Sequence, residues 1–266
     1  MDDFADAVES SADGPIGYVT INRPEKRNAL TRAMSARIRE LIATHDRDPA
    51  IRVVVLRGQP GAFCAGTDLQ SLAGQDPSQR GLGGNNLFED DFADFGWLED
   101  HAIPVIAAVD GPAVGLGAEL ALQADLRVVT ERARLLWNFP ARGLVADTGA
   151  GTWKLPRLIG EGQASLLLLT GRPLEGAEAH RIGFAEVYAE SADLDDTVRE
   201  LAGQIAGLAP LSVRWTKQLL KAGRTNSPRA HRVQTMRVLE ACFRTEDHHE
   251  GITSFLERRD AVFVGR

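Results

Sequence analysis

Two glycine-rich turns and one glutamate are the residues best suited to chemistry. Residues 61–69 (GAFCAGTDL) and 110–120 (DGPAVGLGAEL) each follow an apolar run and consist mainly of small residues. Small residues let a ligand approach the main chain closely, and the first N–H groups of a helix have no internal acceptor. The second turn opens a helix, so an anion is favoured at Leu116. Two such turns could form an oxyanion hole, although each alone is also explained as an ordinary tight turn.

Glu119 follows Leu116 by three residues, which is about one helical turn. Its side chain can therefore face the same pocket as the Leu116 N–H. A carboxylate among leucine, alanine and valine side chains is expected to have a raised pKa, which suits a general acid or base near neutral pH. The alternative is a solvent-exposed helix glutamate without a catalytic role.

The same segment does not predict a nucleotide cofactor. A dinucleotide fingerprint starting at Gly115-Leu116-Gly117 requires glycine or alanine at position 120, where this sequence has Leu120. The six histidines show no ligand spacing with a third donor, so we predict no metal site and interpret them as surface residues.

The elements that must position these residues alternate between strands and helices. This alternation predicts an α/β core of repeated β-β-α or β-α units. The expected strands are Ile16–Asn22, Arg52–Arg57, Val105–Val109 and Leu126–Thr130, and the expected helices are Leu30–His45, capped by Thr31 or Asn28, and Leu116–Ala124. Residues 74–86, rich in glycine, glutamine and asparagine, are expected to form a surface loop.

The last part of the chain has a different pattern. Apolar residues at 194, 198, 201, 205 and 208 predict a helix with one apolar face, which Pro210 is expected to stop. Helical patterns continue to about Asp260. We therefore predict an α/β core over residues 1–190 and a C-terminal helical region over residues 191–266, which would cover an active site or contact a neighbouring subunit.

Composition excludes several classes of function. The chain has 266 residues and a net charge of −7, which argues against an extended nucleic-acid-binding surface. Its two cysteines, Cys64 and Cys242, fit a reducing compartment. The acidic N-terminus resembles no signal peptide, and no run reaches the roughly 18 apolar residues that span a bilayer. These features predict a cytoplasmic protein without a membrane segment.

Several motifs, taken in order, resemble the enoyl-CoA hydratase/isomerase (crotonase) family. FCAGTDL (63–69) is similar to its first oxyanion motif and GPAVGLGAELALQADLRV (111–128) to its second. NRPEKRNAL (22–30) resembles its coenzyme A motif, while LPRLIG (155–160), LTG (169–171) and GITSFLERR (251–259) match in order and spacing. The resemblance covers about residues 15 to 260.

The resemblance implies a fold, an assembly and a set of site residues. The fold is a spiral of β-β-α units, in trimers that are often paired into hexamers. The backbone N–H groups of Thr67 and Leu116 would hold the thioester oxygen. Coenzyme A would lie along residues 23–30 and 65–69. Phe255 and Arg258 would reach its nucleotide end, either within one chain or across a subunit interface. The binding candidates are Arg23, Lys26, Ala29, Ala65, Gly66, Asp68, Leu69, Gly115, Gly117, Phe255 and Arg258.

The catalytic carboxylates match the family only in part. Glu119 aligns with one hydratase glutamate, but the position of the second falls on Phe139, and phenylalanine cannot transfer a proton. Asp147 resembles the acid that some double-bond isomerases of the family carry, although an aspartate before Thr-Gly could equally be a helix N-cap. Trp137 and Phe139 would either line an acyl pocket or pack in the core.

We therefore expect an enzyme that moves a proton at the α-carbon of an unsaturated acyl-CoA, giving double-bond isomerisation or hydration. No redox cofactor is expected, because the thioester itself makes that carbon acidic. The alternatives are another reaction on an acyl-CoA, such as hydrolysis, decarboxylation or dehalogenation, or a homologue that binds acyl-CoA without turnover.

Overall fold

A computed structural model of the chain describes residues 4–59, 61–70, 97–146 and 150–266. The strands in these ranges are β1 (Val8–Asp13), β2 (Ile16–Ile21), β3 (Val53–Gly58), β4 (Val105–Val109), β5 (Pro112–Val114), β6 (Leu126–Thr130), β7 (Arg134–Leu136), β8 (Leu174–Glu175) and β9 (Val187–Ala189). The α-helices are α1 (Arg32–Arg47), α3 (Trp97–Asp100), α4 (Leu116–Gln123), α5 (Ala150–Trp153), α6 (Leu155–Ile159), α7 (Glu161–Thr170), α8 (Gly176–Arg181), α9 (Leu194–Ala206), α10 (Pro210–Ala222), α11 (Pro228–Cys242) and α12 (Glu246–Glu257). Short 3₁₀ turns occupy Phe4–Ala7, Pro24–Lys26, Pro140–Arg142 and Ser191–Asp193.

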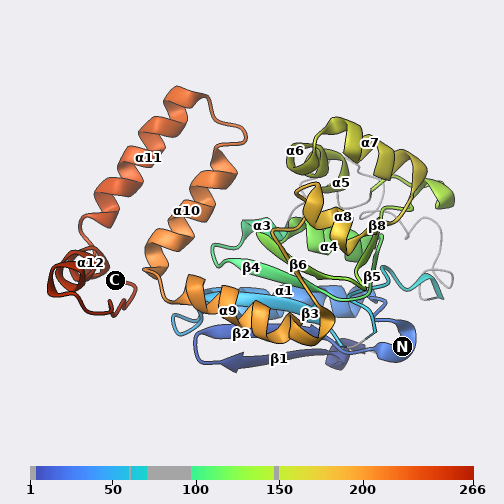
Figure 1. Ribbon diagram of the computed structural model, residues 1–266, viewed down its shortest axis with the longest axis horizontal. Helices are drawn as coiled ribbons and strands as arrows, with labels where there is room; N and C mark the ends of the chain where they lie inside the picture. The colour runs from blue at the N-terminus through green and yellow to red at the C-terminus, as the bar shows by residue number, and fades with distance from the viewer. Residues whose placement is uncertain (1–3, 60, 71–96, 147–149) are drawn as a thin grey trace.

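The main sheet has the strand order β1-β2-β3-β4-β6-β9 (Figure 1). β1 runs antiparallel to β2, and every later pair is parallel. Successive residues of β3 are buried on opposite faces, since Val54 and Leu56 join one hydrophobic cluster while Val53 and Val55 join another. Burial on both faces explains why this strand reads as an unbroken apolar run.

Helices cover both faces of this sheet. On one face, α1 contributes Met34 and Ile38 to the larger cluster, and its N-terminus is capped by the Thr31 side chain, which accepts a hydrogen bond from the Met34 N–H at 3.2 Å. On the other face, α9 buries Val198 and Ala202 against β3, β4 and β6. The first helix of the predicted C-terminal region therefore lies against the α/β core.

A smaller sheet links the main sheet to the turns of interest. Its strand order is β5-β7-β8, with β5 and β7 parallel. β4 leads through a two-residue turn into β5, and β5 leads through Gly115 into α4. The two glycine-rich turns thus follow the carboxyl ends of β3 and β4, neighbouring parallel strands, where ligand sites of α/β proteins commonly lie.

The three last helices, α10 to α12, form an arm that extends away from the sheets (Figure 1). α10 docks to the core through Arg214, whose guanidinium lies 2.8 Å from the Asp46 carboxylate, and through Lys217, which donates to the Ile103 carbonyl at 2.8 Å. α11 buries none of its residues. This arm therefore presents much of its surface, including apolar side chains, outside the chain's own core.

The sequence predicted β4 and β6 with their observed bounds, and α1, α4, β2 and β3 within two residues. β1 was not predicted because only Val8 of its residues is buried, so it carries no apolar pattern. Pro210 is the first residue of α10, whereas α9 already ends at Ala206. The prediction that every histidine lies on the surface is wrong for His45, which is 8% exposed and hydrogen-bonded to Ser10. The predicted loop at 74–86 lies outside the described residues.

Candidate active site

The first glycine-rich turn is fastened to the segment that ends at Leu30. The Leu30 N–H donates to the Gly66 carbonyl at 2.8 Å, and the Asp68 N–H donates to the Leu30 carbonyl at 2.8 Å. In this parallel bridge the residue between the two bonded groups, Thr67, directs its own N–H to the opposite side. No acceptor among the described residues takes that N–H.

The second turn lies alongside the first. The Cys64 N–H donates to the Pro112 carbonyl at 3.1 Å, and the Val114 N–H donates to the Cys64 carbonyl at 2.9 Å. A Cβ added at Gly66 would lie 3.6 Å from the Leu116 nitrogen, so this amide lies beside the first turn. Leu116 is the first residue of α4, and within the described ranges its N–H also has no acceptor.

Gly115 makes the entry into α4 possible. Its φ of 53° lies in the left-handed region, which glycine adopts without a steric penalty. Its N–H donates to the Leu136 carbonyl at 2.8 Å, which fixes the turn against β7. The structure therefore brings the two predicted donors, Thr67 and Leu116, onto adjacent turns, and their oxyanion role stays a prediction.

Glu119 is fully buried, so it is not a solvent-exposed helix glutamate. Its Oε1 accepts a hydrogen bond from the Trp137 indole N–H at 2.8 Å, and its Oε2 accepts one from the Gly151 N–H at 3.0 Å. These two donors fix the orientation of the carboxylate one helical turn below the Leu116 amide. A carboxylate held in this way can exchange a proton with a ligand carbon at the turn.

Neither of the two groups that hold Glu119 was predicted to bind it: Trp137 was expected to line an acyl pocket or pack in the core, and Gly151 had no predicted role. Trp137 is 0% exposed and packs edge-to-face on Phe184, with ring centroids 5.6 Å apart. A buried tryptophan requires an acceptor for its indole N–H, and this rule could have directed attention to a nearby carboxylate. Gly151 had no comparable signal, because only the fold shows that a Cβ there would lie 2.5 Å from the Glu119 Oε1.

Phe139 lies at the second turn. Its side chain is buried, and its ring atoms lie 3.8 Å and 3.9 Å from the position of a Cβ on Gly115. An apolar ring therefore borders the turn that carries the Leu116 amide. Asp147, the second predicted catalytic residue, lies outside the described residues.

Two of the predicted coenzyme A contacts pair with each other, and their contact with coenzyme A stays a prediction. Arg23 and Asp68 are both buried, and their guanidinium and carboxylate groups lie 2.8 Å apart. Arg23 also donates to the Ala29 carbonyl at 3.1 Å. This pair braces the first turn against the segment at residues 23–30.

Asn28, missed as a positioning residue, adds to the same brace. It is fully buried with a φ of 60°, and its amide nitrogen donates to the Ala62 carbonyl at 2.6 Å. Lys26 and Leu69 are exposed nearby, and Ala29 and Ala65 are half-buried. These four residues remain accessible for binding.

The structure separates the last two predicted contacts from the others. Phe255 and Arg258 lie at the end of α12, on the arm, far from α4 in the same chain (Figure 1). Phe255 is 81% exposed. Within one chain, therefore, these residues do not join the turns at Thr67 and Leu116.

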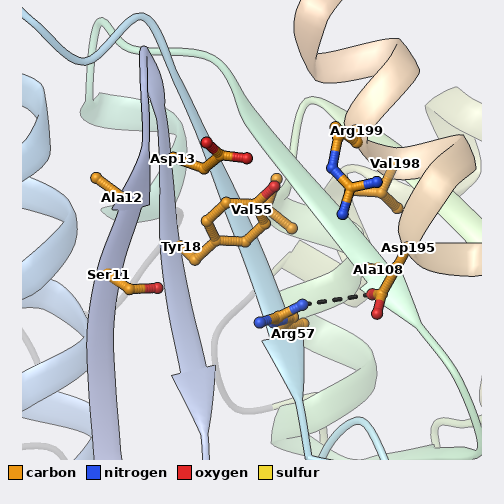
Figure 2. A pocket seen from close by; sticks show the side chains of 10 residues that line it. All are labelled: Ser11, Ala12, Asp13, Tyr18, Val55, Arg57, Ala108, Asp195, Val198 and Arg199. Atoms are coloured by element: carbon orange, nitrogen blue, oxygen red, sulfur yellow. Dashed lines mark hydrogen bonds and ion pairs between the residues drawn. The ribbon is translucent and has the colours of Figure 1, made fainter.

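A hollow elsewhere on the molecule contains none of the predicted site residues. Figure 2 shows it between β1–β3 and α9, with a volume of about 200 Å³. Arg57 pairs with Asp195 at 3.3 Å and lies over the Tyr18 ring. Among the described residues, no three histidine, cysteine or acidic side chains form a metal-binding group, and no described helix is long and apolar enough to cross a membrane.

Fold and site together define an α/β protein with two backbone donors on adjacent turns beside a buried carboxylate. The family model described as enoyl-CoA hydratase/isomerase matches residues 11–266. A crotonyl-CoA hydratase of Syntrophomonas wolfei is 34% identical, with 94% of this chain and 95% of that protein covered. A 1,2-epoxyphenylacetyl-CoA isomerase of Escherichia coli is 32% identical, covering 93% and 94%.

A solved structure of an enoyl-CoA hydratase has the same fold as this chain. An enoyl-CoA hydratase of Mycobacterium tuberculosis superposes with a TM-score of 0.87 at 34% identity, covering 98% of this chain and 99% of that one. The chain belongs to the enoyl-CoA hydratase/isomerase family, has the crotonase fold and is an enzyme that acts on an acyl-CoA thioester.

Proposed function

We propose that the enzyme shifts the double bond of an unsaturated acyl-CoA. Glu119 removes a proton from the α-carbon of a 3-enoyl-CoA, and the electron pair moves onto the thioester oxygen, which the N–H groups of Thr67 and Leu116 hold. The proton returns at the γ-carbon and gives the 2-enoyl-CoA. The observation that carries this proposal is the buried Glu119 carboxylate, oriented by Trp137 and Gly151 below the Leu116 amide.

Phe139 favours isomerisation over hydration. The family resemblance puts the second hydratase glutamate at this position, and hydration needs two groups that handle the protons of water. The phenylalanine ring can neither activate water nor return a proton, and it borders the second turn. Asp147 is proposed as the second acid of the proton transfer, on the resemblance to family isomerases.

The test is turnover of a 3-enoyl-CoA and a trans-2-enoyl-CoA, each in deuterated water. Isomerisation gives the 2-enoyl ester from the first substrate, with deuterium at the γ-carbon wherever the proton exchanges with solvent. Hydration, the reaction named for the Syntrophomonas relative, would instead give a 3-hydroxyacyl-CoA and overturn the proposal. Calorimetric binding without any product would identify a homologue that only binds acyl-CoA.

The arm supports a proposal on assembly. We infer a homotrimer or homohexamer, because α11 buries none of its residues and Met236, Phe243, Ile252 and Phe255 are at least half exposed. In such an assembly, Phe255 and Arg258 would reach the coenzyme A of a neighbouring subunit. Light scattering after size exclusion tests the assembly, and Arg258→Gln should weaken coenzyme A binding.

Compartment and cofactor use complete the proposal. Cys64 and Cys242 are free thiols, and burial raises the pKa of Cys64 to about 12, so this thiol stays protonated and unreactive. Free thiols fit the proposed cytoplasmic location. No redox cofactor is needed for the proposed reaction, because the thioester supplies the acidity of the α-carbon.

A further inference from the structure

A cavity of about 510 Å³ lies between the core and α10. Its lining comes from α3, from the last turn of α4, from the segment at the start of α5 and α6, and from the C-terminal half of α10. Gln123 and Ala150 belong to this lining. Gln123 follows Glu119 by four residues on α4, and Ala150 precedes Gly151, so the cavity adjoins the elements that hold the catalytic carboxylate.

The lining of the cavity has more cationic side chains than carboxylates to pair with them. One carboxylate oxygen of Glu99 lies 2.5 Å from the Lys154 ammonium, and the other lies 2.5 Å from the Arg224 guanidinium. One carboxylate therefore serves two cations. The other lysines of the lining, Lys217 and Lys221, each have an acidic partner of their own. Among the described residues, the ion pairs of the cavity thus leave one positive charge in excess.

Lys154 is the buried member of this group. Burial lowers its pKa to about 8, although the Glu99 carboxylate acts in the opposite direction, and Arg127 and Arg224 lower the pKa further. A buried ammonium is costly unless it is fully paired. The Lys154 ammonium also donates to the carbonyls of Gln123 at 3.2 Å and Ala124 at 3.1 Å, so its hydrogen bonds are satisfied. What a bound anion would balance is the surplus positive charge that Glu99 leaves by serving both Lys154 and Arg224.

Gln123 contributes an unused donor. Its side chain is 1% exposed, and its amide nitrogen has no hydrogen-bond partner among the described residues. A buried donor without an acceptor is unfavourable, because it has lost its hydrogen bond to water and gained none in the protein. An excess positive charge and an unused N–H in one lining both select a ligand that is an anion and a hydrogen-bond acceptor.

We propose that this cavity binds a carboxylate at the far end of the acyl chain of the substrate. This inference rests on the proposed function, which places the α-carbon at Glu119. Four residues of helix separate Glu119 from Gln123, a distance of about 6 Å. Since three bonds of an extended chain span about 3.3–3.6 Å, roughly five bonds beyond the α-carbon bring a carboxylate to the cavity. The substrate class is an ω-carboxylated unsaturated acyl-CoA.

The test compares two 3-enoyl-CoA esters of equal chain length, one ending in a methyl group and one in a carboxylate. The intact enzyme should prefer the carboxylate ester in kcat/KM by about tenfold or more, as expected for a charge-assisted hydrogen bond. Lys154→Met and Gln123→Met should each reduce this ratio. Comparing the two esters within each variant cancels any general damage to the fold. An intact enzyme that prefers the methyl ester, or neither, overturns the inference while leaving the proposed isomerisation in place.

A binding measurement separates this inference from the proposed function. Calorimetry on Glu119→Gln should show tighter binding of the carboxylate ester even if neither ester is converted by the intact enzyme, and equal binding refutes the site. Adipate without coenzyme A tests the other source of a carboxylate, with Trp153 fluorescence as the local signal because Trp153 lines the cavity. Adipate binding that is lost in Lys154→Met would assign the cavity to a free carboxylate and overturn the acyl assignment.

Discussion

Gly117→Ala should separate the two turns of the proposed oxyanion hole. Gly117 lies in the first turn of α4, and a Cβ there would lie 2.1 Å from the Cys64 carbonyl oxygen and 2.9 Å from the Cys64 carbonyl carbon. Both atoms belong to the main chain. The Cys64 carbonyl is also bonded to the Val114 N–H and the Cys64 N–H to the Pro112 carbonyl, so no flexible side chain can give way.

The size of the displacement follows from the contact distance. Ordinary contacts of a Cβ begin at 3.4 Å, so the separation of 2.1 Å must grow by roughly 1 Å. A misplacement of about 1 Å can cost about 10²-fold in rate, and the loss of one oxyanion donor costs about 10²–10³-fold. We therefore expect kcat/KM to fall about 100-fold. Overpacking should also lower the free energy of unfolding by about 1–3 kcal/mol.

Steady-state kinetics with a 3-enoyl-CoA and urea unfolding measure the two effects. Gly203→Ala is the matched control, because Gly203 is also helical but a Cβ there meets nothing within 4 Å. The control should keep its activity and gain up to about 1 kcal/mol in stability from its higher helix propensity. A folded Gly117→Ala enzyme with the kcat/KM of the control would refute the proposal that these two amides act together.

Other substitutions test separate parts of the site and of the fold. Glu119→Gln should abolish proton exchange at the α-carbon, seen as no deuterium uptake, while calorimetry still detects acyl-CoA binding. Trp137→Phe removes one donor to Glu119 and should lower kcat about tenfold with little change in KM, because the lost bond orients only the reacting carboxylate. Phe139→Glu should raise the yield of 3-hydroxyacyl-CoA over the intact enzyme; an unchanged yield would remove Phe139 as the reason for isomerisation. Asp46 tests the docking of the arm: burial alone would raise its pKa, but hydrogen bonds from His101, Ala102 and Ile103 and the charge of Arg214 outweigh it and lower the pKa to about 2. Because the folded value lies below the ordinary 3.8, this carboxylate stabilises the fold above pH 3.8 and loses the effect as pH falls through 2, by about 2 kcal/mol. In Asp46→Asn, the free energy of unfolding measured with urea should vary less with pH between 2 and 3.8. An unchanged pH dependence would contradict the assignment of this effect to Asp46.

The elements were predictable wherever burial leaves a pattern in the sequence. β4 and β6 are buried almost throughout, so their apolar runs define them from end to end. α1 has one apolar face and a threonine cap. β1 was missed because an edge strand with one buried residue has no such pattern, and Pro210 was misread because proline is tolerated in the first turn of a helix as well as after its end.

The backbone segments of the candidate site were predictable, and the side-chain partners within it were less so. The turns at Thr67 and Leu116 were found from small residues after apolar runs, which are local features. Arg23 and Asp68 were predicted as coenzyme A contacts from the family resemblance of the segments that contain them. Their mutual ion pair joins residues 45 positions apart in the sequence. Such a pairing depends on how the neighbouring strands β2 and β3 place the segments that follow them.

Three glycines show why these features act as one unit. A Cβ at Gly66 would lie 2.5 Å from the Val114 carbonyl oxygen, one at Gly117 would meet Cys64, and one at Gly151 would lie 2.5 Å from the Glu119 Oε1. Each glycine therefore lets one part of the site approach another more closely than any side chain permits. Composition identifies such residues as small, but their effect is a distance between segments far apart in the chain. A substitution at any of the three should disturb the amides and the carboxylate together, because each of these contacts joins two of the segments that form the site.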